Sequence, residues 1–190
     1  KIYARELFGF ISTAGPLFDK EIVNKVLNIA LDRNDPRQEN AIAIMGYFIS
    51  FGVRAVLTSP VLVSFLTSAR NGYFQIHTTI KGVPYVLIDT FFGLLTDALE
   101  YNPQLALDRE FISLIEQSYQ ELERFAVQKE VQARFGHSLL LAYDDYRILQ
   151  EEIRQIRIAS ITRNSSSPIS QSSSDSNQPL AKFRVEKMDI

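Results

Sequence analysis

Apolar residues recur at the spacing of an α-helix along most of the chain, from Ile2 to about Ile161. Residues three and four positions apart lie on one face of a helix, so each such run predicts a helix with one buried face. Turn and capping residues separate the runs. The predicted helices cover, in order, residues 19–33, 36–51, 59–71, 84–99, 108–125 and 127–158.

Particular residues mark several of the predicted helix ends. Asp35 and Asp108 are predicted N-caps, because a carboxylate accepts hydrogen bonds from the free N–H groups of a first turn. Pro36 fits the first turn of its helix, where a missing N–H costs nothing. Gly52 is predicted to end the same helix, since glycine readily adopts the left-handed conformation of many helix ends.

Two stretches allow two interpretations each. Between residues 73 and 88, apolar residues alternate and Lys81-Gly82 offers a turn, which fits a β-hairpin. A loop followed by a helix from Pro84 is favoured, because an isolated hairpin has no further strand to pair with. The long last helix is predicted to break near Gly136 or at Asp144-Asp145.

The predicted helices that begin near Asp19, Ser59 and Asp108 are about 40 to 50 residues apart, which is the period of two-helix solenoid repeats. We therefore predict an all-α fold for residues 1–161, built as a HEAT-like solenoid of antiparallel helix pairs. Because the first residue is Lys1 and not Met, we expect the chain to be a fragment of a longer solenoid.

The composition changes after residue 161. Residues 162–179 are rich in Ser and nearly free of apolar side chains, so they cannot bury enough surface to offset the entropy cost of ordering. This segment is predicted to be a disordered Ser-rich linker. Apolar residues return at Leu180, Phe183, Val185 and Met188, and residues 180–190 are therefore predicted to form a short docking segment.

Composition argues against most catalytic chemistry. The chain has no Cys and only two His, which lie far apart at His77 and His137. It contains no His-Glu-x-x-His pattern, no Gly-rich phosphate loop and no Gly-x-Ser-x-Gly elbow. The Asp144-Asp145 pair is interpreted as two solvated carboxylates. We predict that the protein is not an enzyme and that it has no catalytic residues, cofactor or metal ion.

Net charge and hydropathy limit the classes of binding partner that we expect. The 20 Lys and Arg residues nearly balance the 22 Asp and Glu residues, so the bulk charge of −2 predicts no steering toward nucleic acid. No apolar run reaches the roughly 20 residues that a membrane-spanning helix needs, so no membrane span is expected. The 13 Phe and eight Tyr residues are interpreted as core, although a small-molecule-binding helical bundle is an alternative.

Two features at the start of the Ser-rich segment and just before it suggest regulation. Arg154, Arg157 and Arg163 form a small basic cluster that could contact an anion or an acidic partner. Stabilisation of a helix C-terminus by cations is the simpler explanation for the cluster. Ser160 follows Arg157-Ile158-Ala159 and Ser167 precedes Pro168, so both are predicted phosphorylation sites, where an added phosphate brings about −1.5 to −2 charge beside the arginines.

Short motifs resemble repeats of the HEAT type. Asp35-Pro36-Arg37, followed by the small residues Ala41 and Ala43 and then by Met45-Gly46, resembles the turn and second helix of that repeat. Within HEAT proteins, the order of segments over residues 19–150 resembles the C-terminal half of the condensin G subunit. The further matching segments are Phe92-Gly93-Leu94-Leu95, Glu130-Val131-Gln132-Ala133 and Leu139-Leu140-Leu141.

The resemblance implies a non-enzymatic subunit that grips a kleisin-type chain and acts in chromosome condensation. DNA would then be contacted only indirectly or by a longer assembly. Our leading hypothesis is a scaffold that binds protein subunits of a larger complex, in the nucleus or the cytoplasm. The alternative is a regulatory or trafficking adaptor, for example a GTPase-regulator or signalling-complex subunit, with a phosphoregulated tail.

Overall fold

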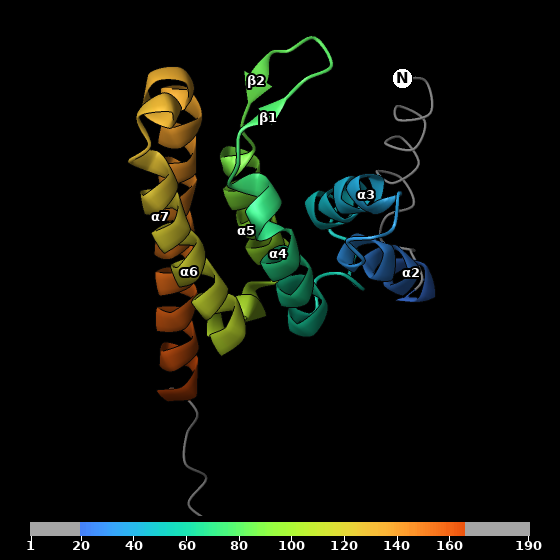
Figure 1. Cartoon of the computed structure of the whole chain (residues 1–190). Coiled ribbons are helices and arrows are strands. Elements are labelled where there is room, and N and C mark those ends of the chain that lie inside the picture. Colours follow the sequence, from blue (N-terminus) through green and yellow to red (C-terminus); the bar gives the residue numbers. More distant parts are fainter. Residues whose placement is uncertain (1–19, 166–190) are drawn as a thin grey trace, which may run out of the picture.

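The computed structural model describes residues 20–165 and the side chains of residues 20–162, and this part of the chain is mainly helical (Figure 1). The predicted all-α class is confirmed at this level. The helices are α2 (Lys20–Leu31), α3 (Gln38–Ser50), α4 (Ser59–Tyr73), α5 (Ile88–Tyr101), the 3₁₀ helix η2 (Pro103–Leu107), α6 (Arg109–Ala126) and α7 (Lys129–Ser165). Two short strands, β1 (His77–Thr78) and β2 (Pro84–Tyr85), form a hairpin between α4 and α5.

The helices pack as three pairs in two rows. Helix α2 packs against α3, α4 against α5, and α6 against α7. Along one row α2 contacts α4 and α4 contacts α6, while along the other α3 contacts α5 and α5 contacts α7. Figure 1 shows the same order across the molecule, from α2 and α3 on the right to α6 and α7 on the left. Each pair therefore buries its inner face against its neighbour.

Phenylalanine rings fill the centre of the core. Phe91 and Phe92 of α5 are fully buried, and their ring centroids lie 5.8 Å apart with the rings nearly perpendicular. Phe74, which directly follows α4, meets Phe91 at 5.5 Å, Phe92 at 6.2 Å and Phe125 of α6 at 6.4 Å, all edge to face. Edge-to-face pairs of this kind add stability beyond the area that they bury. These aromatic residues form the core, as the sequence predicts.

Two predicted helix ends are confirmed. The Asp108 carboxylate accepts a hydrogen bond from the Phe111 N–H at 2.9 Å and so caps α6. At the end of α3, Gly52 adopts a φ of +68°, and its N–H donates to the Ile49 carbonyl. The next N–H, from Val53, donates to the Phe48 carbonyl. This pair of bonds is the Schellman motif, which occupies carbonyls that the end of a helix otherwise leaves free.

The predicted start of α3 is wrong by two residues. The helix begins at Gln38 and its N-cap position is Arg37, so Asp35 does not cap it and Pro36 lies in the preceding turn. The Asp35 carboxylate accepts hydrogen bonds from the Arg37 backbone N–H at 2.8 Å and from the Nε and Nη2 atoms of its guanidinium at 3.0 and 2.7 Å. This pairing with Arg37 lowers the pKa of Asp35 to about 2. The Asp35 carboxylate therefore stabilises the turn that precedes α3 and does not cap the helix.

The favoured interpretation of residues 73–88 is wrong, because the chain forms a hairpin there. His77 pairs with Tyr85 and Thr78 with Pro84, and α5 begins at Ile88 instead of Pro84. Within residues 20–165 the hairpin has no third strand, but the half-buried His77 ring stacks on Tyr85 at 5.1 Å and an interplanar angle of 23°. Its Nε2 lies 2.6 Å from the Gly72 carbonyl oxygen and donates to it. Both contacts are local, within residues 72–85, and they support the hairpin without a third strand.

The last helix kinks once, at one of the two predicted places. Phe135, next to Gly136, leaves the helical conformation with φ −125° and ψ 23°, whereas α7 continues through Asp144-Asp145. The helix extends to Ser165, four residues beyond the predicted domain boundary, so the first residues of the predicted 162–179 linker are helical. The rest of that linker and the predicted docking segment 180–190 lie outside the described residues.

The two motif glycines, Gly46 of Met45-Gly46 and Gly93 of Phe92-Gly93, have different environments. Gly46 lies in α3, where an added Cβ would meet Leu94 at 3.8 Å and the Tyr73 hydroxyl at 3.9 Å. Gly93 lies in α5 with no atom within 4 Å of such a Cβ. The first glycine is in close packing between helices and the second faces open space, so the two positions are not equivalent.

Candidate binding surfaces

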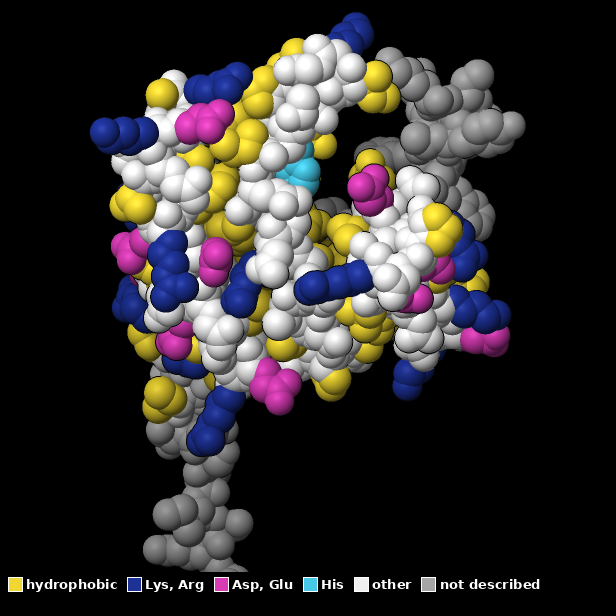
Figure 2. All heavy atoms as spheres, in the orientation of Figure 1, with side chains coloured by type: hydrophobic (Ala, Val, Ile, Leu, Met, Phe, Trp, Pro, Cys, Tyr) yellow, Lys and Arg dark blue, Asp and Glu magenta, His cyan; other side chains and the backbone are white. Residues whose placement is uncertain are grey.

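A groove is bounded by α3, the end of α4, the hairpin and the start of α5. Its volume is about 780 Å³, within the range of about 300–1,000 Å³ that is common for ligand-binding clefts. Figure 2 shows the hollow beneath the hairpin, beside the block that α2 and α3 form. Among the residues that line it are Ile42, Tyr47, Ser50, Tyr73, His77, Tyr85 and Leu94.

Aromatic side chains form much of the groove wall. The stacked rings of His77 and Tyr85 come from the two strands of the hairpin, and Tyr47 comes from α3 on the other side. Tyr73 is buried beneath them, and burial raises the pKa of its hydroxyl to about 12. This phenol stays neutral at physiological pH. The aromatic part of the wall offers stacking surface and hydroxyl groups, and Arg33 and Glu39 add charged side chains to the lining.

Polar contacts hold the two sides of the groove together. The Ser50 hydroxyl donates to the Asp97 carboxylate at 2.6 Å and links α3 to α5 across a sequence separation of 47 residues. The Asn102 amide donates to the Leu57 carbonyl at 2.8 Å and links the loop before α4 to the end of α5. Of these residues only Ser50 belongs to the groove lining, and its bond joins α3 to α5 there.

The tip of the hairpin presents apolar side chains to solvent. Ile80 has a relative exposure of 108% and Val83 of 58%. The turn between them is well formed, because the Thr79 N–H donates to the Val83 carbonyl at 2.9 Å and Gly82 adopts a φ of +75°. Figure 1 shows the hairpin standing clear of the helices. An ordered loop that exposes two β-branched apolar residues is a typical interaction site.

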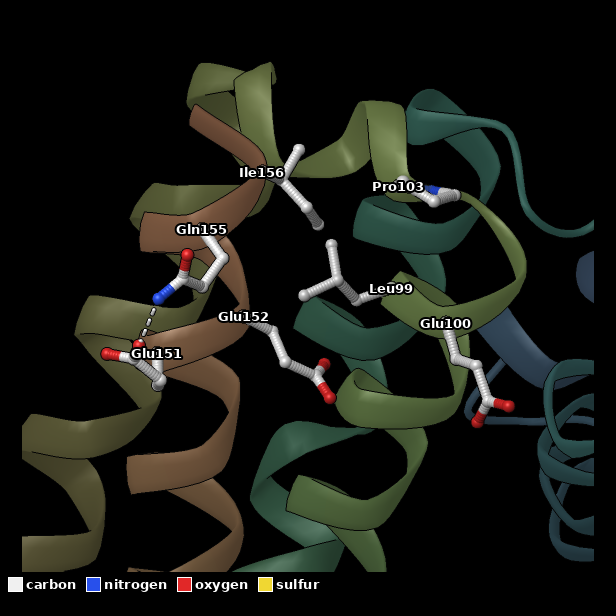
Figure 3. Close-up of a pocket in the computed structure, with 7 residues that line it drawn as sticks. All are labelled: Leu99, Glu100, Pro103, Glu151, Glu152, Gln155 and Ile156. Atoms are coloured by element: carbon white, nitrogen blue, oxygen red, sulfur yellow. Dashed lines mark hydrogen bonds between the residues drawn. The ribbon is translucent and has the colours of Figure 1, made fainter. Parts of the chain in front are cut away.

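A second, smaller pocket of about 280 Å³ lies between the end of α5, η2 and α7. Figure 3 shows Leu99 and Ile156 pointing toward each other across it, with Pro103 at one end. Carboxylates surround this apolar floor: Glu100 on α5, and Glu151 and Glu152 on α7. Burial raises the pKa of Glu152, and the charge of Glu100 raises it further.

The predicted basic cluster is partly committed to contacts within the fold. Arg154 forms a two-pronged pair with Glu151, at 2.6 and 2.8 Å. The Arg157 Nε donates to the Ala106 carbonyl of η2 at 2.9 Å and so fastens α7 to η2. The Arg163 side chain lies outside the described side chains. Anion binding by this cluster stays a prediction.

The two predicted phosphorylation sites differ in what the structure shows. Ser160 lies within α7, half-buried, and its hydroxyl donates to the Arg157 carbonyl at 2.7 Å. A phosphate there would stand near the C-terminal end of a helix, where the helix dipole disfavours negative charge. Ser167 lies outside the described residues.

Residues considered for catalysis or metal binding are dispersed. His137 lies in α7, far along the chain from the hairpin that carries His77. Asp144 pairs with Arg147 at 3.3 Å, while burial and then the charges of Asp89, Asp144 and Asp97 raise the pKa of Asp145. Within residues 20–165, no group of three or more His, Cys, Asp or Glu side chains is placed to hold a metal ion. None of the helices in this part is long and apolar enough to cross a membrane.

Comparison with known proteins found no relative of this chain. No family model matches it, and no curated protein or solved structure matches it significantly. The resemblance to HEAT repeats and to the condensin G subunit therefore stays a prediction from the sequence motifs. The surfaces most suited to binding, the hairpin tip and the groove, were not among the predicted site residues. The alternating apolar run that ends at Ile80 was the available signal.

Proposed function

We propose that the protein is a non-enzymatic scaffold that binds another protein through the hairpin tip and the adjoining groove. The observation that carries the proposal is the full exposure of Ile80, with Val83 beside it, on an ordered hairpin whose base forms one wall of the groove. A partner that covers these side chains would bury apolar surface worth about 25 cal/mol per Å². The aromatic wall would then contact the same partner segment.

We further propose that the helices are part of a HEAT-like solenoid. The packing of successive pairs in two rows supports this, since solenoid repeats contact mainly their neighbours. The motifs that resemble the condensin subunit lie on α3, α5 and α7, which are the second helices of the three pairs and pack next to one another. The unlike surroundings of Gly46 and Gly93 count against a strict repeat.

Site-specific photo-crosslinking tests the scaffold proposal. A photoreactive amino acid at position 80 or 83 is expected to capture a discrete protein in cells that express the chain. The matched control positions are 127 and 140, because Val127 and Leu140 are also strongly exposed apolar residues, with relative exposures of 72% and 66%. Val127 lies between α6 and α7, and Leu140 lies within α7, so both are outside the hairpin. Equal capture at all four positions would refute a specific hairpin interface.

Binding measurements with the captured protein then give the energetic test. Interface residues that anchor a partner typically cost more than 1 kcal/mol when truncated. Ile80→Ser combined with Val83→Ser is therefore expected to weaken binding at least about tenfold, which corresponds to about 1.4 kcal/mol. The control pair Val127→Ser and Leu140→Ser is expected to change binding less than about twofold. An unaltered affinity in the hairpin variant would contradict the proposal.

The condensin-type role is the more specific form of this proposal. Its test is co-purification with a kleisin-type chain, followed by measurement of DNA binding by the complex at several salt concentrations. Contacts to DNA phosphates give a steep linear fall of log K with log salt. Failure to co-purify, or a flat salt response, would favour the regulatory or trafficking adaptor instead.

A further inference from the structure

We propose that the smaller pocket, between α5, η2 and α7, is the docking site for the chain's own C-terminal segment, Leu180–Ile190. The pocket's volume of about 280 Å³ lies at the lower limit of the range of about 300–1,000 Å³ that is common for ligand-binding clefts. It suits one or two apolar side chains. The segment supplies these as Phe183 and Val185.

The charges of the pocket and the segment are complementary. Neither Glu100 nor Glu152 takes part in an ion pair within the described part of the chain, and both residues line the pocket. Figure 3 shows the Glu152 carboxylate beneath Leu99 and the Glu100 carboxylate pointing outward from the end of α5. In the segment, Lys182 and Arg184 directly flank Phe183. Seating Phe183 between Leu99 and Ile156 would therefore bring cations to the two like charges at the rim. Cations near these carboxylates relieve their mutual repulsion.

The length of the chain allows this contact. Ile156 lies nine residues before the end of α7 at Ser165, which is about 14 Å along a helix that rises 1.5 Å per residue. The 17 residues between Ser165 and Phe183 reach roughly 56–61 Å when extended, and as a flexible chain they span about 20–25 Å on average. A tether of this length places the segment at an effective concentration of about 1 mM. Even weak docking would then be populated within one molecule.

Disulfide trapping tests the proposal cleanly, because the chain has no Cys of its own. The test variant carries Gln155→Cys at the pocket and Val185→Cys in the segment of the full chain. The control variant carries Ile161→Cys with Val185→Cys. Position 161 lies closer to the start of the tether and about 120° away around the helix, so an undocked segment would react faster there.

Docking is expected to reverse that order, so that the pocket pair forms an intramolecular disulfide at least about fivefold faster than the control pair. Adding Phe183→Ser, or Glu100→Gln with Glu152→Gln, is expected to lower the rate to that of the control. Circular dichroism verifies that each variant keeps its helices. A pocket pair no faster than the control, or one unaffected by Phe183→Ser, overturns the proposal. Disulfide-linked dimers that increase with protein concentration overturn it too, because the segment would then bind a second copy.

Discussion

Gly52 offers a prediction whose size can be worked out from two separate costs. Its φ of +68° is strained for residues with a Cβ, and an added Cβ would lie 2.7 Å from the Tyr101 ring. The left-handed conformation costs Ala about 1 kcal/mol. Tyr101 is 52% exposed, so its ring can rotate away, at a further cost of about 0.5–1.5 kcal/mol for leaving its rotamer. Gly52→Ala is therefore expected to cost about 2 kcal/mol.

Thermal unfolding measures this cost, because about 1 kcal/mol corresponds to about 2–4 °C in Tm for a chain of this size. Gly52→Ala is expected to lower Tm by about 4–8 °C. In a Tyr101→Ser background the clash is absent, so the same substitution is expected to cost only about 1 kcal/mol. The difference between the two backgrounds is the coupling energy of a double-mutant cycle, about 1 kcal/mol.

Two other glycines serve as controls. Gly82 has a φ of +75° but no atom within 4 Å of an added Cβ, so Gly82→Ala is expected to cost only the backbone term of about 1 kcal/mol. Gly93 lies inside α5 and faces open space, so Gly93→Ala is expected to stabilise the fold by about 0.5–1 kcal/mol. A neutral Gly52→Ala, or the same loss with and without Tyr101, would refute the reasoning.

Three further substitutions test other contacts. Phe74→Ala is expected to cost about 3–5 kcal/mol in urea unfolding, because it empties the centre of the aromatic core; a loss below about 1 kcal/mol would contradict that placement. Asp145→Asn is expected to raise Tm at pH 7 by about 1–2 °C. Since the pKa of Asp145 is raised in the folded state, its charged carboxylate destabilises the fold above that pKa. The gain in Tm should therefore disappear as the pH falls through the raised pKa toward 3.8. A gain in Tm that grows in acid would contradict an upward shift of this pKa. Arg157→Ala is expected to lower Tm by about 2–4 °C through loss of the bond to Ala106, and Arg157→Lys should lose less; equal Tm values for all three chains would show that the bond contributes nothing.

Local chemistry explains which parts of the fold the sequence predicts. The cap at Asp108 and the stop at Gly52 depend on residues within a few positions of each other, so the pattern alone reveals them. The start of α3 was misplaced because Asp35 has two possible uses, and the nearby Arg37 decides between them. That competition depends on side-chain geometry, which the order of residues does not specify.

The two pockets depend on contacts between distant residues, whereas the hairpin gives only a short local signal. Strands of two residues are too short to give a clear alternation, and His77 and Tyr85, whose rings stack, face each other directly across the hairpin. The small pocket needs Leu99 and Ile156, which are 57 positions apart. Arg157, predicted only as part of a basic cluster, bonds to Ala106 across 51 positions. Helix content was therefore predictable, whereas the surfaces that helix packing creates were not.

The position of Phe74 has a mechanical consequence for the hairpin. This side chain stands three residues before β1, yet its ring touches rings of both α5 and α6. Because only a few residues separate Phe74 from β1, we expect a molecule that binds the hairpin to restrict the motion of the rings packed on Phe74. Occupation of the loop tip should slow amide hydrogen exchange in helices that the bound molecule never touches.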